Sequence, residues 1–365
     1  MKLKKEYWEM YRAAYQHTEL SENQKNRIID IYMRDGKDVI YEAAKIKKLV
    51  PAISCLMCEL EVDLDFWKPI ADDYRKRNLR IISCLDEMYS VLNRNGVKHI
   101  AVVENFGALL SSTQDLAMFG SGDLDEYALP EERDKIYSIL KKNGYSIDEV
   151  KAGEIIVSSS IRRDDFPEGF YFSINWDVTN RLNLPSFSAN GDFIGWDKCR
   201  YYKDTEIRLP SPEGLMYVCL MHIAVHGFCK APDIRLYYDI ANAAEQGLDW
   251  NVLVNWAERD GNSVKISMAA YLSHKLLGVE IPKFVFEIGN QKQFQRLLQV
   301  VYEPIDNRLH DFPPAKDRFF IDVYSNDDGV VNGIKEIVLP NNRWIKARYG
   351  SVFLGHIKHC IRLIR

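Results

Sequence analysis

The sequence predicts an α+β protein in which a small mixed β-sheet lies between two helical segments. Apolar residues recur at helical spacing up to about residue 95, short β-branched runs alternate with helices up to about residue 205, and helical spacing then returns. We therefore expect an N-terminal helical segment over 1–95, an α/β core over 96–205 and a C-terminal helical domain over 206–365.

The central region is expected to follow the order strand, helix, strand, helix, strand, strand. The strands are predicted from β-branched and alternating runs, and the helices from apolar residues at intervals of three and four. The six elements are VKHIAVVEN (97–105), FGALLSSTQDLAM (106–118), DLDEYAL (123–129), PEERDKIYSILKKNG (130–144), GEIIVSSSIRR (153–163) and GFYFSINWDVTN (169–180).

Two helices have clear boundary signals. Pro130 suits a first helical position, Lys141 and Lys142 suit the negative end of the helix, and Gly144 suits its exit. Ser211, followed by proline and glutamate, is a typical start signal for the first helix of the C-terminal domain.

Composition is that of an ordinary globular protein, with 47% apolar and 27% charged residues among 365. The formal charge of −4 provides no overall attraction to nucleic acid. The first residues mix charges with aromatics, unlike a secretory signal, and no run approaches the roughly 18 to 20 apolar residues that span a bilayer. We expect a cytoplasmic protein without a transmembrane segment and with reduced cysteines.

An acidic pair follows a glycine-rich turn in GSGDLDEYALP. On a strand, Asp123 and Asp125 project from the same face with their Cβ atoms about 6 to 7 Å apart. Such a pair repels itself unless a cation lies between the carboxylates, and Mg²⁺ often takes one or two carboxylates together with phosphate oxygens and water. The alternative is a solvated loop, in which aspartate and glycine are common.

The order and spacing of these segments, over roughly residues 40 to 280, resemble the bacterial family of uncharacterised nucleotidyltransferases within the polymerase β-like superfamily. The matching segments are IYEAAKIKKLVPAISCLM, VKHIAVV, GDLD, KKNGYS, INWDV and MHIAVHGF…RLYYDIANAAEQGLDW. The resemblance implies nucleotidyl transfer from a nucleoside triphosphate. It assigns Asp123 and Asp125 to Mg²⁺, and the turn formed by Gly120, Ser121 and Gly122 to phosphate.

The chain departs from the family pattern at several positions. Glu104 and Asn105 stand where the family has Lys-Gly, and Phe119 stands where an arginine precedes the acidic pair. Ser173 occupies the place of the third acid, and Glu126 occupies a place that is normally apolar. Loss of the two cations makes the predicted site less positive, and each charge-assisted contact contributes about 1.5 to 3 kcal/mol.

Two residues are candidates for the missing third acid. Residues 173, 175 and 177 share one face of a strand, so Asp177 is able to act from two places further along, next to Asn175, which replaces a family histidine. Glu104 is the other candidate, from the end of the first strand. A strand-end turn role for Asp177 stays open.

Two groups in the C-terminal domain have alternative interpretations. The pattern C-x2-H-x3-H-x2-C over 219–229 is compatible with a zinc site or with a packed helix. Arg235 and Asp239 form either an intrahelical pair or, through the guanidinium group, a phosphate contact.

The segment over 341–365 carries six lysines and arginines among apolar and aromatic residues. A packed terminal helix with solvated charges is one interpretation. Contact with an anionic partner, such as nucleic acid or a membrane surface, is the other.

We expect a divergent nucleotidyltransferase that uses Mg²⁺ and a nucleoside triphosphate, with Asp123, Asp125 and Asp177 as catalytic residues and Gly120–Gly122 and Arg235 as substrate contacts. The acceptor is a peptide, a carbohydrate or RNA. The alternative is a catalytically degenerate binding module of the same fold in a peptide or polysaccharide modification pathway. A third alternative is a toxin-like enzyme that modifies transfer RNA.

Overall fold

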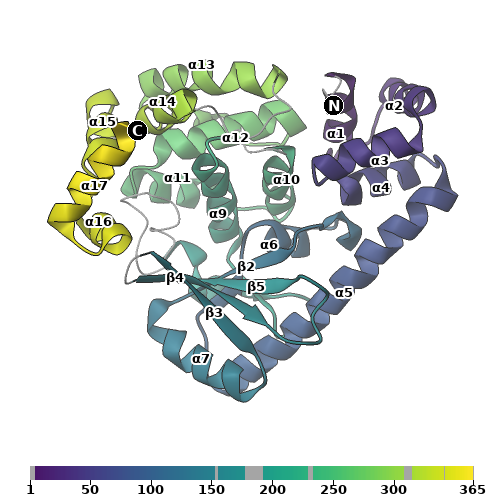
Figure 1. Ribbon diagram of the computed structural model, residues 1–365. Helices are drawn as coiled ribbons and strands as arrows, with labels where there is room; N and C mark the ends of the chain where they lie inside the picture. Colours follow the sequence, from purple (N-terminus) through teal and green to yellow (C-terminus); the bar gives the residue numbers. More distant parts are fainter. Residues whose placement is uncertain are drawn as a thin grey trace.

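The computed structural model describes residues 5–152, 155–176, 192–228, 233–307, 315–340 and 342–364. A small sheet lies below a layer of helices, and one long helix runs from the N-terminal helices down along the sheet (Figure 1). This arrangement confirms the predicted α+β class with helices before and after the sheet.

The helices before the sheet are α1 (Lys5–Ala13), α2 (Glu22–Asp35), α3 (Lys37–Ile46), α4 (Val50–Glu59) and α5 (Leu64–Arg94). The helices of the central region and of the layer above the sheet are α6 (Glu104–Leu110), α7 (Arg133–Lys142), α9 (Pro212–Val225), α10 (Asp233–Ala244), α11 (Trp250–Arg259) and α12 (Ser263–Leu277). The last helices are α13 (Gln291–Asn307), α14 (Ala315–Tyr324), α15 (Val330–Val338), α16 (Asn342–Tyr349) and α17 (Val352–Ile364).

The main sheet has the strand order β1-β2-β5-β4-β3, in which β2 and β5 are parallel and the other neighbours antiparallel. Its strands are β1 (Ile100–Val102), β2 (Asp123–Ala128), β3 (Ser146–Ala152), β4 (Ile155–Arg162) and β5 (Tyr171–Asn175). Two short strands, β6 (Arg200–Tyr201) and β7 (Arg208–Leu209), pair separately. The strand that carries the aspartate pair is therefore an interior strand, paired on both sides.

Sequence patterns did not predict β3. Its sequence, SIDEVKA, contains three charged residues in seven and no β-branched run. In the sheet, β3 is an edge strand that pairs with β4 alone, and edge strands accommodate charged side chains because one side faces solvent. The predicted helix over 106–118 also divides, since α6 ends at Leu110 and a short 3-10 turn covers Leu116–Met118.

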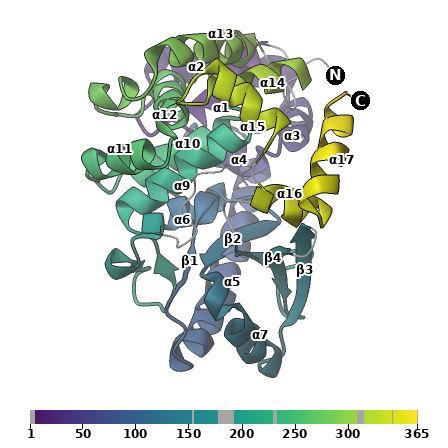
Figure 2. The same cartoon turned by 90° about the vertical axis from the view of Figure 1, so that its left-hand side faces the viewer.

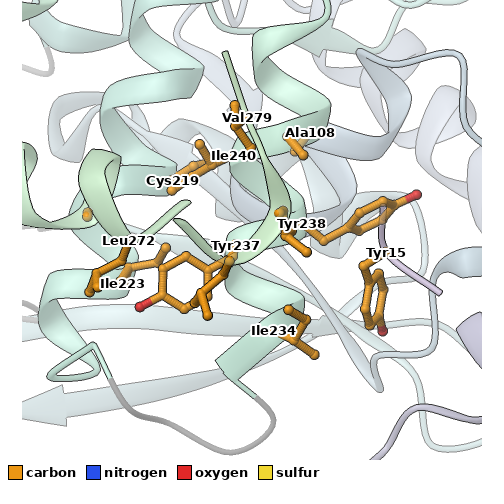
Figure 3. Packing of buried hydrophobic residues seen from close by; sticks show 14 of the residues in the cluster. Tyr15, Ala108, Cys219, Ile223, Ile234, Tyr237, Tyr238, Ile240, Leu272 and Val279 are labelled. Atoms are coloured by element: carbon orange, nitrogen blue, oxygen red, sulfur yellow. The ribbon is translucent and has the colours of Figure 1, made fainter. Parts of the chain in front are cut away.

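The two faces of the sheet pack against different helices. Leu124 and Ala128 of β2 belong to a core shared with α5 and α7, whereas Tyr127 belongs to a core shared with α6, α9 and α10. Figure 2 shows α5 and α7 beside the sheet and the layer of α9 and α10 above it. The residues labelled in Figure 3 include Cys219 of α9 and Tyr237 of α10, both within this upper core.

Within the described residues, no helix is both long enough and apolar enough to cross a bilayer.

Candidate functional site

The predicted acidic pair lies on β2, on the sheet face that is shared with α6 and α9. Asp123 is partly buried, and its two carboxylate oxygens accept hydrogen bonds from the Ser121 hydroxyl (2.6 Å) and from the Tyr171 hydroxyl (3.3 Å). Asp125 is 5% exposed, and its Oδ1 accepts a hydrogen bond of 3.1 Å from the Asn175 side-chain amide. These donors are neutral, so they orient the carboxylates without cancelling their charge.

Strand β5 determines which side chains face the acidic pair. In the parallel register, Asp123 lies beside Tyr171, Asp125 beside Ser173, and Tyr127 beside Asn175. The position expected for a third acid is therefore next to Asp125, but it carries the Ser173 hydroxyl. Asp177, the proposed substitute, lies outside the described residues.

Arg77 of α5 holds the glycine-rich turn, and sequence analysis did not identify it. Its Nη2 donates a hydrogen bond of 2.6 Å to the Ser121 carbonyl, and its guanidinium carbon lies 5.2 Å from the Phe170 ring centroid and 6.0 Å from that of Phe119. Partial burial lowers the pKa of Arg77. A cation from α5 therefore lies over Phe119, the position at which the resemblance led us to expect an arginine. No local pattern links residues so far apart in the sequence.

Close packing fixes the same turn. A Cβ atom at Gly120 would lie 2.4 Å from Cγ of Pro51 in α4, so a side chain there requires the two segments to separate. The Asn78 amide, fully buried in α5, donates to the carbonyls of Leu116 (2.7 Å) and Phe119 (2.8 Å). The turn is therefore anchored to two helices before the chain enters β2.

Glu104, the second candidate for the third acid, follows β1, and its carboxylate lies against a histidine of α9. Its Oε2 lies 3.1 Å from Nδ1 of His222, and both side chains are largely buried. The neighbouring Val103 amide donates to the Asp125 carbonyl (2.9 Å), which places the pair next to β2. Glu104 has a φ of 56°, a left-handed conformation that L-residues adopt at a cost of order 1 kcal/mol.

The structure does not support the zinc interpretation. His222 faces Glu104, Cys219 is fully buried in the upper core, and Cys229 lies outside the described residues. Among the residues that the structure describes, no group of three or more potential metal-ligating His, Cys, Asp or Glu side chains occurs.

Asp239 and Arg235 of α10 lie near this pair. Asp239 is buried, and burial raises its pKa well above the usual range; the charge of Arg235 opposes this rise, and Glu104 adds to it. The described residues contain no ion pair between Arg235 and Asp239 and no hydrogen-bond partner for the buried Nε of Arg235. The arrangement is therefore not a closed intrahelical pair.

Glu126 points to the opposite face of β2, into the core formed with α5. It is fully buried, which raises its pKa to about 8; the nearby Tyr89 hydroxyl opposes this rise, and the charge of Asp125 adds to it. Neither Glu126 oxygen has a hydrogen-bond partner at normal length among the described residues.

A comparison with family models supports the predicted relationship. The model described as "Uncharacterised nucleotidyltransferase" matches residues 36–278, about two thirds of the chain, and this range includes the acidic pair, Arg77, Glu104 and His222. No curated protein and no solved structure matches the chain. The chain belongs to the family of uncharacterised nucleotidyltransferases.

Proposed function

We propose that this protein transfers a nucleotidyl group from a nucleoside triphosphate to a hydroxyl or phosphate of a peptide, carbohydrate or RNA acceptor, with Mg²⁺ held by Asp123 and Asp125. The main support is the placement of both carboxylates on one face of an interior strand, with neutral donors at their oxygens. An interior strand has little freedom to move, and this chemistry depends mainly on fixed charges.

The donor set fits Mg²⁺ better than zinc. Two carboxylates supply hard oxygen ligands, and Mg²⁺ typically completes its shell with water and substrate phosphates. The β5 neighbour of Asp125 is Ser173, not an acid, so substrate phosphates and water would have to supply the remaining oxygen ligands. When bound, Mg²⁺ would neutralise charge on the triphosphate.

The chain's own cations are proposed to bind the triphosphate. Arg77 holds the turn of Gly120, Ser121 and Gly122 and brings positive charge to it. Arg235 contributes a buried Nε that lacks a hydrogen-bond partner among the described residues, as expected of a guanidinium group that meets an anion in the complex.

Proton transfer from an acceptor hydroxyl requires a base near the acidic pair. The Glu104–His222 pair lies beside β2 on the same sheet face, and a carboxylate paired with an imidazole is able to take up a proton in this way. We assign this role to the pair, with Asp177 as the alternative from β5.

Isothermal titration with a non-hydrolysable ATP analogue tests the proposal. We expect binding that requires Mg²⁺ and is lost in Asp123→Ala and Asp125→Asn, because either change removes a charged ligand. Asp134→Ala, a change of an exposed aspartate on α7, is the control and should bind normally. Mg²⁺-independent binding that both site variants retain would remove the basis for the proposed catalysis.

The second candidate function is a binding module without catalysis, favoured by Glu104 and Phe119 in place of two cations. Incubation of the protein with cell extract and radiolabelled nucleoside triphosphates distinguishes the two functions. A labelled product that depends on Asp123 excludes the binding module. Absence of label with all four triphosphates favours it.

A further inference from the structure

Large apolar side chains are concentrated on the outside of the last helices. In the described part of the chain, seventeen large apolar residues are exposed. Eight of them lie on α15, on α17 or directly after α15, with exposures between 37% and 79%. We call these residues the C-terminal apolar surface: Val331, Ile334, Val338, Leu339, Phe353, Leu354, Ile357 and Ile361. On α17, residues 353, 357 and 361 recur every four positions and so form one stripe.

The opposite faces of the same helices are well packed. A Cβ at Gly355 would lie 2.4 Å from Cγ2 of Ile345, and one at Gly333 would lie 2.5 Å from the Val323 carbonyl oxygen. Nε2 of His359 lies 2.7 Å from the Ile337 carbonyl oxygen. The small residues therefore face the protein, and the large apolar residues of α15 and α17 face outward. A surface helix in water normally turns its large apolar side chains to the core and its polar side chains to solvent, so the arrangement on α15 and α17 is reversed.

The distribution of charged residues also changes in this region, at Glu336. After Glu336 the sequence contains six lysines and arginines and no aspartate or glutamate, whereas the whole chain has a net charge of −4. The first 336 residues therefore carry a net charge of −10 and the last 29 a net charge of +6. Lys346 and Lys358 are exposed in this basic segment. A basic, apolar end on an acidic protein favours an anionic partner.

We propose that α15 and α17 dock this protein on an anionic lipid surface, with the C-terminal apolar surface entering the headgroup region and the basic side chains contacting lipid phosphates. Nucleic acid would use the positive charge but would leave eight large apolar side chains in water. A second copy of the chain would bring two segments of charge +6 together. A membrane interface accommodates both features at once.

Docking in this way would bring the sheet close to the membrane. Helix α16 contacts β3, the outer strand of the sheet, and Figure 2 shows α16 just above β3 and β4, with α17 further up. The inference does not depend on nucleotide chemistry, because it uses residues outside the candidate site.

Vesicle flotation with the full chain tests the proposal. Vesicles of phosphatidylcholine with about 30% phosphatidylglycerol should bind the protein, pure phosphatidylcholine should bind it far less, and raising NaCl from about 0.1 to 0.5 M should weaken binding. Phe353→Ser with Ile357→Ser should lower the affinity at least about tenfold, because two apolar side chains no longer enter the interface. Lys346→Glu with Lys358→Glu should weaken binding to the anionic vesicles in particular.

Matched controls use exposed residues elsewhere. Met33→Ser with Ile46→Ser changes apolar residues of α2 and α3, and Met33 is 75% exposed, as is Phe353. Lys76→Glu with Lys142→Glu makes the same charge change on α5 and α7. Both controls should bind vesicles as the unchanged protein does.

Three outcomes would overturn the proposal. The first is that anionic vesicles fail to bind the protein or bind the Phe353→Ser, Ile357→Ser variant equally well. The second is a short RNA duplex that binds while vesicles do not. The third is a dimer, seen by sedimentation, that this variant abolishes without any effect of lipid, which would make the surface a contact between copies.

Discussion

The Asn175 side-chain amide lies 3.1 Å from Oδ1 of Asp125 and 3.1 Å from the Glu126 carbonyl oxygen, so one group of β5 contacts both a candidate metal ligand and the backbone of the strand that carries it. The resemblance led us to expect a histidine at this position, and in this chain the Asn175 amide donates to Asp125. The amide is neutral, so this hydrogen bond does not bring a positive charge to Asp125.

Asn175→Asp should make stability depend on Mg²⁺. The change replaces a donor with a second carboxylate facing Asp125, so the free energy of unfolding in EDTA should fall by about 1.5 to 3 kcal/mol. Added Mg²⁺ should recover most of that loss, and urea unfolding with and without the ion measures it. The exposed Asn255→Asp on α11 should change little under either condition. Equal destabilisation of Asn175→Asp in EDTA and in Mg²⁺ would show that no ion binds there.

Ser173→Asp should increase nucleotidyl transfer. The residue is the β5 neighbour of Asp125, and the new carboxylate would supply a base of the kind that contributes factors of about 10² to 10⁴ elsewhere. We expect at least about a tenfold rise in labelled product per minute. Ser160→Asp is the control. Ser160 of β4 pairs with Ser173, so this substitution adds the same charge one strand further from Asp125. If both variants formed more product, added negative charge alone would explain the effect. If Ser173→Asp formed no more product than the unchanged protein, the prediction would be contradicted.

Arg77→Gln should weaken triphosphate binding and stability together. The lost hydrogen bond to the Ser121 carbonyl involves a charged donor, so the free energy of unfolding should fall by about 1.5 to 3 kcal/mol, and affinity for the nucleotide should fall about tenfold or more. Arg80→Gln on the same helix also removes a donor to a carbonyl, that of Asp165, but away from the turn. It should leave nucleotide affinity unchanged. Equal effects of the two variants on affinity would exclude a specific role for Arg77.

Local sequence patterns predicted the features that depend on neighbouring residues. The Asp123–Asp125 pair follows from strand alternation, and the end of the helix at Gly144 follows from a residue that tolerates the observed φ of 81°. The resemblance placed the third-acid position at Ser173, and the register between β2 and β5 puts that residue next to Asp125.

Contacts between distant segments were beyond such patterns. Arg77 reaches Ser121 from another helix, and His222 meets Glu104 only because α9 packs against α6. Strand β3 was missed for a related reason, since an edge strand needs no apolar run and forms through its pairing with β4. Glu104 stays a candidate acid, and its contact with His222 was not expected, because that histidine had been assigned to helix packing or zinc.

Glu126→Leu should stabilise the protein, increasingly as the pH rises. Burial raises the folded-state pKa of Glu126 to about 8 from the 4.5 of an exposed glutamate, so between these values the folded protein holds a proton that the unfolded chain has released. Stability of the unchanged protein therefore declines across that window, by at most about 1.4 kcal/mol per pH unit from this group. Leucine has no proton to lose and fills a similar volume beside Tyr89.

Urea unfolding in EDTA from pH 5 to pH 8 measures the difference between this variant and the unchanged protein, free of any metal bound at Asp125. The difference in the free energy of unfolding between Glu126→Leu and the unchanged protein should widen with pH and exceed about 1 kcal/mol at pH 8. That value is the lower end of the cost of leaving a buried polar group unsatisfied. Glu126→Gln, which keeps the shape without the titration, should also remove the pH-dependent decline. Glu168→Gln in an exposed loop should not. Parallel pH curves for Glu126→Leu and the unchanged protein would mean that the buried carboxyl group has found a partner that holds its charge.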